Sequence, residues 1–256
     1  MIAARPVTDD RAASVLGRVS PLTKLGIAVM WLIAMAVIGG YLVPVVIGGV
    51  ALAAGLVLGR IGPLDLLRAL LPLWTVAAIV ILSNIVFGVA NTDPAAHEIA
   101  RIGPLRVTAE AVGAALAVGV RVLAIAAVGV VVALTTEPTR LVDALVQQAG
   151  VSDRFGYGAL AAYQAIPRFA DDLTTLRQAR RLRGLRGSWH PRILVGLLVL
   201  AIRHGDRVAL AMDARGFGSG PRTRYRVARW TRLDLALGLG AVVVLAVAVI
   251  TLAVAS

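Results

Sequence analysis

Five apolar segments, each about as long as a lipid bilayer is thick, constrain this chain more than any other feature. Four lie at 22–38, 41–58, 70–90 and 108–134, and the fifth begins near Leu233 and reads LDLALGLGAVVVLAVAVITLAVA. A helix of about 20 apolar residues crosses a hydrocarbon core roughly 30 Å thick. Because 59% of the residues are hydrophobic and only 16% are charged, a soluble domain is excluded. The sequence predicts an all-α integral membrane protein with about five transmembrane helices and long cytoplasmic helices.

Two further apolar patterns are not expected to change this count. Ala34, Met35 and Ala36 form an A-x-A pattern like that of a signal-peptide cleavage site, but the apolar run continues past it, so we expect an uncleaved anchor. The run 193–202 lies between two arginines. Ten residues reach only ~15 Å as a helix, so this run is predicted not to cross the membrane.

The positions of the basic residues predict the orientation. With the N-terminus inside, the cytoplasmic parts hold 23 of the 26 Lys and Arg residues, the external loop holds Arg101 and Arg106, and Arg121 lies within a span. Positively charged loops stay cytoplasmic. The net charge of +12 is therefore read as membrane orientation rather than as a nucleic-acid site. We predict three regions: 1–134 with four spans and a cytoplasmic N-terminus, 135–231 as a cytoplasmic helical region, and 232–256 as the final span.

The cytoplasmic region contains two helical stripes that end in the same way. Its 16 Arg and 7 acidic residues are interleaved with apolar stretches that a disordered basic loop would lack. With spacings of three and four, the first stripe comprises Ile166, Phe169, Leu173, Leu176, Arg180 and Arg183, and the second comprises Leu194, Leu197, Ala201, His204, Val208, Ala211 and Arg215. Gly184 and Gly216 follow the terminal arginines and suit a left-handed C-terminal cap. We predict two helices that pack along a coiled-coil-like seam.

An arginine at the end of such a helix has two interpretations. It can interact with the helix dipole, worth about 0.3 to 1 kcal/mol, or with lipid headgroups. Alternatively, a rigid helix tip that presents a planar group with five donors suits a carboxylate-bearing groove of another protein. The occurrence of two such ends, 32 residues apart, favours the second interpretation.

The two motifs resemble those of a known family. A-R-R-L-R-G at 179–184 and A-M-D-A-R-G at 211–216 are similar to the paired Ala-Arg-Gly motifs of the transmembrane T component of energy-coupling factor (ECF) transporters. The resemblance extends to TTEPTRLVDAL after the fourth span and to the Ile166-Pro167-Arg168 stretch. Leu182 stands where the family usually has Ala, so the first motif departs from the pattern while the second matches it fully.

The resemblance implies a non-enzymatic coupling scaffold in the bacterial cell membrane. Its partners would be two cytoplasmic ABC ATPases, which bind the ATP, and one small substrate-binding membrane S component, for uptake of a vitamin or metal ion. No cofactor or metal is expected in this chain. The implied ATPase-coupling residues are Ala179, Arg180, Arg183, Gly184, Ala211, Met212, Asp213, Ala214, Arg215 and Gly216. From the stripes, the resemblance and the position of Arg121 within a span, we expect helix packing or S-component contact for Ile166, Pro167, Phe169, Leu173, Leu176, Val208 and Arg121.

Enzymatic interpretations fail on the spacing of the residues they need. The glycine-rich GFGSG at 216–220 lacks the Gly-Lys-Ser/Thr of a phosphate-binding P-loop. His97 and Glu98 lack a second His at metalloprotease spacing, and three scattered His residues make no metal site. The chain has no cysteine, which excludes thiolate ligands and thiol nucleophiles. Asp213 lacks the further aspartates of a membrane lipid transferase.

A permease or membrane-anchored interaction protein with its own substrate site is the remaining alternative. Such a permease should carry several polar residues at mid-span, whereas Arg121, Ser83 and Asn84 are nearly the only ones here. An ionised Arg121 costs at least ~2.5 kcal/mol at that depth, so it must face protein, water or a partner. Either it contacts Asn84 or Ser83 of the third span, or its contact changes as an S component moves.

Overall fold

The computed structural model describes residues 13–93, 96–102, 105–185, 190–220, 224 and 226–255. These residues are mostly helical, which confirms the predicted fold class. They form two compact units: a membrane unit, up to Glu137 and from Arg229 onward, and an α7–α9 unit, Pro138–Ala228. The predicted cytoplasmic N-terminus precedes residue 13 and lies outside the described residues.

The membrane unit contains five apolar helices of unequal length. Its helices are α2 (Val15–Arg18), α3 (Pro21–Val37), α4 (Leu42–Val57), α5 (Pro63–Phe87), α6 (Ala109–Thr135) and α10 (Arg232–Ala255). Among the described helices, α5, α6 and α10 are long and apolar enough to cross a membrane. With 17 and 16 residues, α3 and α4 are shorter, about 26 and 24 Å at 1.5 Å per residue. They are separated by a tight turn in which Gly40 adopts a φ of +86°, a conformation that favours glycine.

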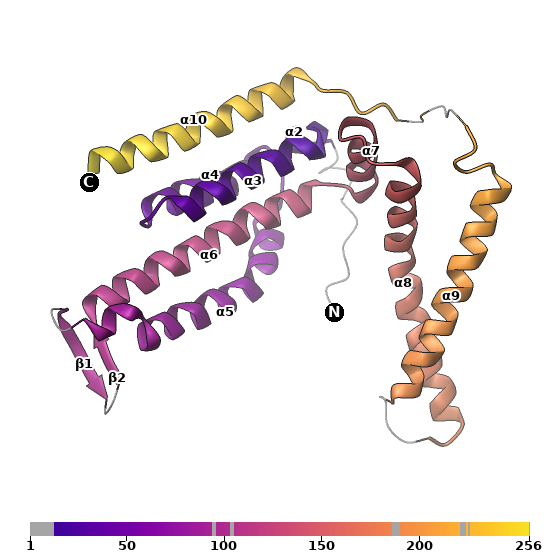
Figure 1. The fold of residues 1–256 in the computed structure, drawn as a ribbon, viewed down its shortest axis with the longest axis horizontal. Coiled ribbons are helices and arrows are strands. Elements are labelled where there is room, and N and C mark those ends of the chain that lie inside the picture. The colour runs from indigo at the N-terminus through magenta and orange to yellow at the C-terminus, as the bar shows by residue number, and fades with distance from the viewer. Residues whose placement is uncertain are drawn as a thin grey trace. The chain divides into compact units, whose positions relative to one another are not determined.

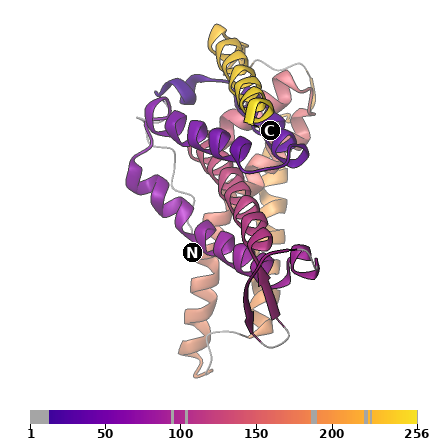
Figure 2. The same cartoon turned by 90° about the vertical axis from the view of Figure 1, so that its left-hand side faces the viewer.

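Small residues bring the helices of the membrane unit close together. Figures 1 and 2 show α6 between α5 and α4, with α10 alongside α3 and α4. A Cβ at Gly55 of α4 would lie 2.8 Å from Val131 of α6. A Cβ at Gly119 of α6 would overlap the side chain of Ile81 in α5. Close backbone approach through small residues is the usual way in which membrane helices pack.

Two buried charges tie the ends of these helices together. The Asp234 carboxylate, at the start of α10, accepts a hydrogen bond of 2.7 Å from the backbone N–H of Ser20. The Lys24 ammonium of α3 donates a hydrogen bond of 2.8 Å to the backbone carbonyl of Thr135, the last residue of α6. Both charged side chains are buried. Such partners offset the desolvation cost of burying a charge.

Arg121 is held by a backbone carbonyl rather than by another polar side chain. Its Nη2 donates a hydrogen bond of 3.0 Å to the carbonyl of Ile38, which caps the C-terminus of α3. A cation is favourable at that end of the helix dipole. The expected contact with Asn84 or Ser83 is not formed: the Asn84 amide donates to the Val80 carbonyl within its own helix.

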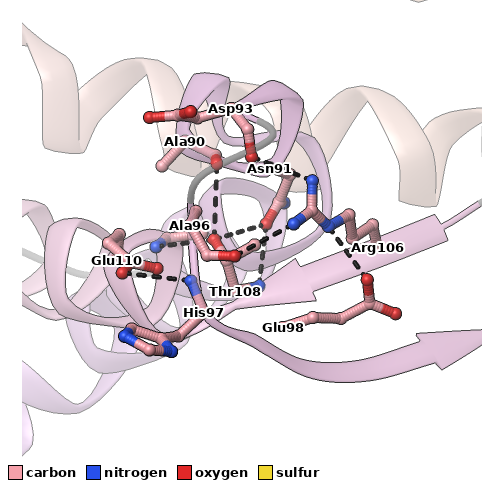
Figure 3. Close-up of polar contacts among 10 residues, drawn as sticks. Ala90, Asn91, Asp93, Ala96, His97, Glu98, Arg106, Thr108 and Glu110 are labelled. Atoms are coloured by element: carbon pink, nitrogen blue, oxygen red, sulfur yellow. Dashed lines mark hydrogen bonds and ion pairs between the residues drawn. The ribbon is translucent and has the colours of Figure 1, made fainter.

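A small β-hairpin between α5 and α6 was not predicted by the sequence. A short 3-10 helix, η1 (Val89–Thr92), is followed by antiparallel β1 (Glu98–Ile102) and β2 (Leu105–Thr108). Figure 3 shows Arg106 in the centre of its polar contacts: the guanidinium pairs with Glu98 at 3.0 Å and donates to the carbonyls of Asp93 and Ala96. The Thr108 side chain is fully buried and donates to Asn91 Oδ1. The described residues of this loop therefore form their own secondary structure and polar contacts.

The α7–α9 unit is a short helix followed by two long ones. Its helices are α7 (Pro138–Gln148), α8 (Asp153–Leu182) and α9 (Pro191–Ala214), and α8 and α9 run in opposite directions (Figure 1). A Cβ at Gly156 of α8 would lie 2.6 Å from Val146 of α7. The run 193–202 forms the first part of α9, which is not among the described helices that qualify as spans.

Candidate functional site

Local signals fix where the two long helices begin. Ser152 caps α8 by accepting a hydrogen bond of 3.4 Å from the backbone N–H of Phe155. His190 caps α9, since its Nδ1 accepts from the N–H of Arg192 at 3.1 Å, and Pro191 occupies the first helical turn. A polar N-cap followed by Pro is a strong helix-start signal.

The C-terminus of α8 is closed by a Schellman motif. Arg183 is the C-cap residue and Gly184 follows with a φ of +71°. The N–H of Gly184 donates to the carbonyl of Arg181 at 3.0 Å, and the N–H of Leu185 donates to that of Arg180 at 3.2 Å. These two bonds define the motif and satisfy carbonyls that the helix leaves unpaired.

The C-terminus of α9 repeats this geometry residue by residue. Arg215 is the C-cap residue and Gly216 has a φ of +65°. The N–H of Gly216 donates to the carbonyl of Asp213 at 2.8 Å, and the N–H of Phe217 donates to that of Met212 at 2.9 Å. Both helices therefore end in arginine, left-handed glycine and a large apolar residue, in the same hydrogen-bonded turn.

The two arginines project from opposite ends of the helix pair. Arg154, in the first turn of α8, donates a hydrogen bond of 3.1 Å to the carbonyl of Gly218, just beyond α9. Arg215 therefore lies near the start of α8, whereas Arg183 follows its last residue. Most of the 30 residues of α8 separate the two ends, roughly 40 Å at 1.5 Å per residue. Both side chains are exposed, and no described residue pairs with either guanidinium.

The seam between α8 and α9 contains some of the predicted stripe residues. The Phe169 and His204 rings meet edge to face with centroids 5.9 Å apart. The Leu176 methyl groups lie 3.5 Å from where a Cβ on Gly196 would stand. Leu173 and Val208 are half-buried, whereas Ile166 and Pro167 are exposed. Ala165 is the buried residue at that level of α8.

The remaining motif residues lie around the two helix ends at Arg183 and Arg215, called the tips below. Ala179, Arg180 and Met212 are half-buried, and Ala211, Asp213 and Ala214 are exposed. The Nε atoms of Arg180 and Arg177 are buried without a hydrogen-bond partner among the described residues. The structure thus gives Arg180 a different environment from the exposed Arg183.

Two polar ties that the sequence does not reveal hold α7 in this unit. The Tyr157 hydroxyl of α8 donates a hydrogen bond of 2.8 Å to the carboxylate of Asp143 in α7. Burial, followed by this bond, raises the pKa of Tyr157 to about 12. The Gln147 side chain donates to the carbonyl of Arg226 and accepts from the N–H of Ala228, so it pairs with the chain on both sides of Val227.

One face of α9 is apolar and exposed, and it includes Leu194, which its spacing had placed on the second stripe. Its large side chains recur at helical spacing over the first half of the helix: Leu194, Val195, Leu198, Val199 and Ile202. Each is at least 43% exposed. A contiguous apolar face of this kind marks an interaction surface.

The pattern of several apolar helices followed by two long helices with matching Arg-Gly ends extends over most of the chain. The profile of the CbiQ family, described as Cobalt transport protein, matches residues 12–227. The chain belongs to the CbiQ family. It is therefore a multi-pass membrane protein and the transmembrane component of a transporter, not an enzyme.

Curated relatives are similar over 57% to 93% of the chain. The Energy-coupling factor transporter transmembrane protein EcfT of Lactococcus lactis is 26% identical over 254 residues, 91% of each chain. The EcfT protein of Limosilactobacillus fermentum is 31% identical over 162 residues, 57% of this chain and 60% of the relative. A putative ABC transporter ATP-binding protein of Bifidobacterium longum is 27% identical over 258 residues, 93% of this chain but only 32% of that protein.

Proposed function

We propose that this chain is the coupling scaffold of an ECF-type importer. It transmits ATP-driven motion from two cytoplasmic ATPase subunits to a separate membrane subunit that binds the substrate, a vitamin or metal ion. The observation that carries this proposal is the repeated tip: Arg183 and Arg215 stand at the C-caps of two equivalent Schellman motifs, exposed and without a described partner.

The geometry of the tips suits docking on two similar partners. Each guanidinium projects from a helix end whose backbone is already fixed, so little conformational entropy is lost when it enters a groove. A guanidinium forms bidentate bonds with a carboxylate, which favours an acidic groove. Because the tips are roughly 40 Å apart on α8 and α9, each would engage its own ATPase subunit, and movement of one subunit relative to the other would be transmitted along the helix pair.

The relatives and the exposed apolar face support the remaining assignments. The Bifidobacterium longum relative carries an ATP-binding name, and a region similar to nearly all of this chain makes up about a third of it. ATP would be bound by the partner subunits, and this chain would hold no cofactor. The apolar face of α9, from Leu194 to Ile202, would contact the substrate-binding subunit. The N-terminus and the α7–α9 unit would face the cytoplasm of a bacterial cell.

Charge reversal at the tips tests the docking. The affinity-tagged chain is purified in mild detergent from cells that express the partner genes, and co-purified proteins are identified by mass spectrometry. Arg183→Glu or Arg215→Glu should each weaken recovery of the ATPase subunits, and the double variant should abolish it together with uptake, because like charges then face each other in the groove. Arg168→Glu and Arg203→Glu, which alter exposed arginines in the middle of the same helices, serve as controls.

The controls should retain the ATPases, and every variant should reach the membrane in normal amount. A double variant that still recovers both ATPases and supports normal uptake would overturn the docking proposal. Equal losses in the Arg168→Glu and Arg203→Glu controls would show that general electrostatics, rather than the two tips, holds the complex together.

A further inference from the structure

A cavity of about 260 Å³ lies within the membrane unit, among α2, α3, α4, α6 and α10. Small residues on α4 and α10 leave this space: Ala51, Ala54, Ala236, Gly240 and Ala241. Its other walls are apolar except for Lys24, whose ammonium donates to the Thr135 carbonyl. The cavity is separate from the Arg-Gly tips, which belong to the α7–α9 unit.

The chemistry of the walls decides between water and hydrocarbon as occupant. A buried water needs two to four polar partners, and these walls provide few. The helices around the cavity are apolar and the longest of them qualify as membrane spans, so acyl chains are the surrounding medium. At about 30 Å³ for each water-sized group, the space accommodates roughly nine methylene groups. A segment of one acyl chain therefore matches both the size and the polarity of the cavity.

Two exposed arginines close in the chain to one end of the cavity indicate which lipid would supply the acyl chain. Leu16 and Leu58 line that end, and the Leu16 N–H donates to the Leu58 carbonyl at 3.2 Å. Arg18 and Arg60 follow two residues after these leucines, and both are exposed. Guanidinium groups bind phosphate strongly. A phospholipid with a net negative charge fits this combination of apolar walls and two exposed arginines close in the chain to one end of the cavity.

We propose that the cavity binds one acyl chain of an anionic phospholipid, whose phosphate contacts Arg18 and Arg60. The chain fills the space that small residues leave between α10 and the helices α3, α4 and α6. The lipid would then act as a structural part of the membrane unit. This site is independent of the proposed coupling function, because none of its residues belongs to α8 or α9.

Trp31 provides a spectroscopic probe inside the cavity. It lines the wall, is only 7% exposed, and its indole N–H donates to the Ala241 carbonyl at 3.2 Å. The substitutions Trp74→Phe, Trp189→Phe and Trp230→Phe leave Trp31 as the only tryptophan. The full chain is reconstituted into phosphatidylglycerol vesicles with or without dibrominated acyl chains, because bromine quenches indole fluorescence on contact. An acyl chain in the cavity should remove most of the Trp31 emission.

A variant that fills the cavity distinguishes quenching by a lipid inside it from quenching by the surrounding bilayer. Gly240→Leu adds a side chain on the cavity wall, where a Cβ meets no atom within 4 Å, and should restore Trp31 emission in brominated vesicles. Gly238→Leu is the matched control: the same substitution on α10, also without a close neighbour, at a residue that does not line the cavity. If Gly240→Leu does not fold, Ala54→Leu fills the same cavity from α4.

Comparisons between lipids with different headgroups identify which lipid is bound. Brominated phosphatidylglycerol should quench Trp31 more strongly than brominated phosphatidylcholine, and the double variant Arg18→Gln, Arg60→Gln should abolish the difference. Native mass spectrometry should show one retained phospholipid, lost in Gly240→Leu and kept in Gly238→Leu. No quenching, or quenching that Gly240→Leu leaves unchanged, would overturn the proposal. Quenching by a brominated free fatty acid in ordinary vesicles, but not by brominated phospholipid, would overturn the assignment to a phospholipid.

Discussion

The membrane unit and the α8–α9 pair use glycine in opposite ways. In the membrane unit, Gly55 and Gly119 lie within helices and let a neighbouring helix approach to a distance that a Cβ would prevent. At the ends of α8 and α9, Gly184 and Gly216 adopt positive φ and stop the helix immediately after an exposed arginine. The first unit is therefore specified by packing along its helices, and the pair by the geometry of its ends.

The membrane unit also buries more of its side chains than the α8–α9 pair does. The membrane unit contains a core built around Trp31, Met35 and Ile47, whereas Gly156, Ala165 and Ile193 are the buried residues in the described α8 and α9. A helix pair with so little buried surface has little packing to hold it in one arrangement. In the proposed function, the well-packed membrane unit would be the rigid scaffold, and the α8–α9 pair would depend on its partners to fix its arrangement.

The largest expected effect concerns the side of the membrane on which the pair lies. The chain contains no cysteine, so single cysteines at Ser152, Ser219 and Thr92 can be labelled in intact cells with a membrane-impermeant thiol reagent. The first two should react only after the membrane is opened, and Thr92→Cys should react at once. Labelling of Ser219→Cys but not of Ser152→Cys would mean that the run 193–202 crosses and would remove Arg215 from reach of any cytoplasmic ATPase.

Overpacking should be most damaging where glycine serves helix approach. Gly119→Leu forces a side chain into Ile81 of α5 and should cost at least about 1–3 kcal/mol, enough to lower the folded yield markedly. Gly113→Leu is the matched control, because it lies in the same helix with no neighbour within 4 Å. Thermal aggregation in mild detergent measures both. Equal melting temperatures would contradict the close-packed description of α5 and α6.

A smaller substitution distinguishes the role of glycine at a helix end from its role within the helix. Gly216→Ala places a Cβ at positive φ, 2.9 Å from the Ser219 hydroxyl, and should destabilise the end of α9 by about 1–2 kcal/mol. Gly205→Ala, in the interior of the same helix, should be neutral or stabilise by about 0.5–1 kcal/mol. Hydrogen exchange at residues 212–217 should speed up only in Gly216→Ala. Uptake should fall in that variant alone, with normal membrane abundance.

The smallest effect concerns the tie between α7 and α8. The pKa of Tyr157 is raised to about 12 in the folded protein, above the ordinary value near 10. The stability it contributes is therefore fully present below about pH 10 and is lost as the pH rises toward 12. Tyr157→Phe should remove this loss and cost about 1 kcal/mol at neutral pH, because Asp143 loses its donor. Thermal unfolding by circular dichroism between pH 7 and 11.5 measures both effects.

Tyr163→Phe is the control for that measurement. It removes a tyrosine hydroxyl from the same helix, but one that is 43% exposed and forms no hydrogen bond with a described residue. It should leave both the pH profile and the neutral-pH stability unchanged. A profile that is the same in Tyr157→Phe and in the unsubstituted chain would show that another group titrates.

The helix inventory and the two helix ends were accessible from the sequence because they depend on local signals. Apolar runs predicted five apolar helices, of which three of the described ones are long enough to cross a membrane, and an arginine followed by glycine at the end of a stripe indicated the left-handed caps at Gly184 and Gly216. The bounds of the first two helices were predicted to within one residue: the runs 22–38 and 41–58 correspond to α3 (Pro21–Val37) and α4 (Leu42–Val57), on either side of the turn at Gly40. The roles of the tips as ATPase contacts stay a prediction.

Features that depend on tertiary placement were missed. The partner of Arg121 is the carbonyl of Ile38, and since every residue has a carbonyl, no side-chain pattern reveals which helix end comes near. The strands β1 and β2 have five and four residues, too few to show an alternating pattern between two membrane helices. Ile166 was placed on the seam by its spacing, but Ala165 is the residue that is buried there.

The most direct test of the coupling proposal is site-specific photo-cross-linking from the two tips. A photoreactive amino acid replaces Arg183 or Arg215 in the tagged chain, with positions 168 and 203 as mid-helix controls, and the complex is irradiated in membranes. We predict that 183 and 215 each capture an ATPase subunit, and that the controls capture far less. Cross-links from both tips only to lipid or to this chain itself, in a preparation that contains the ATPases, would contradict the account.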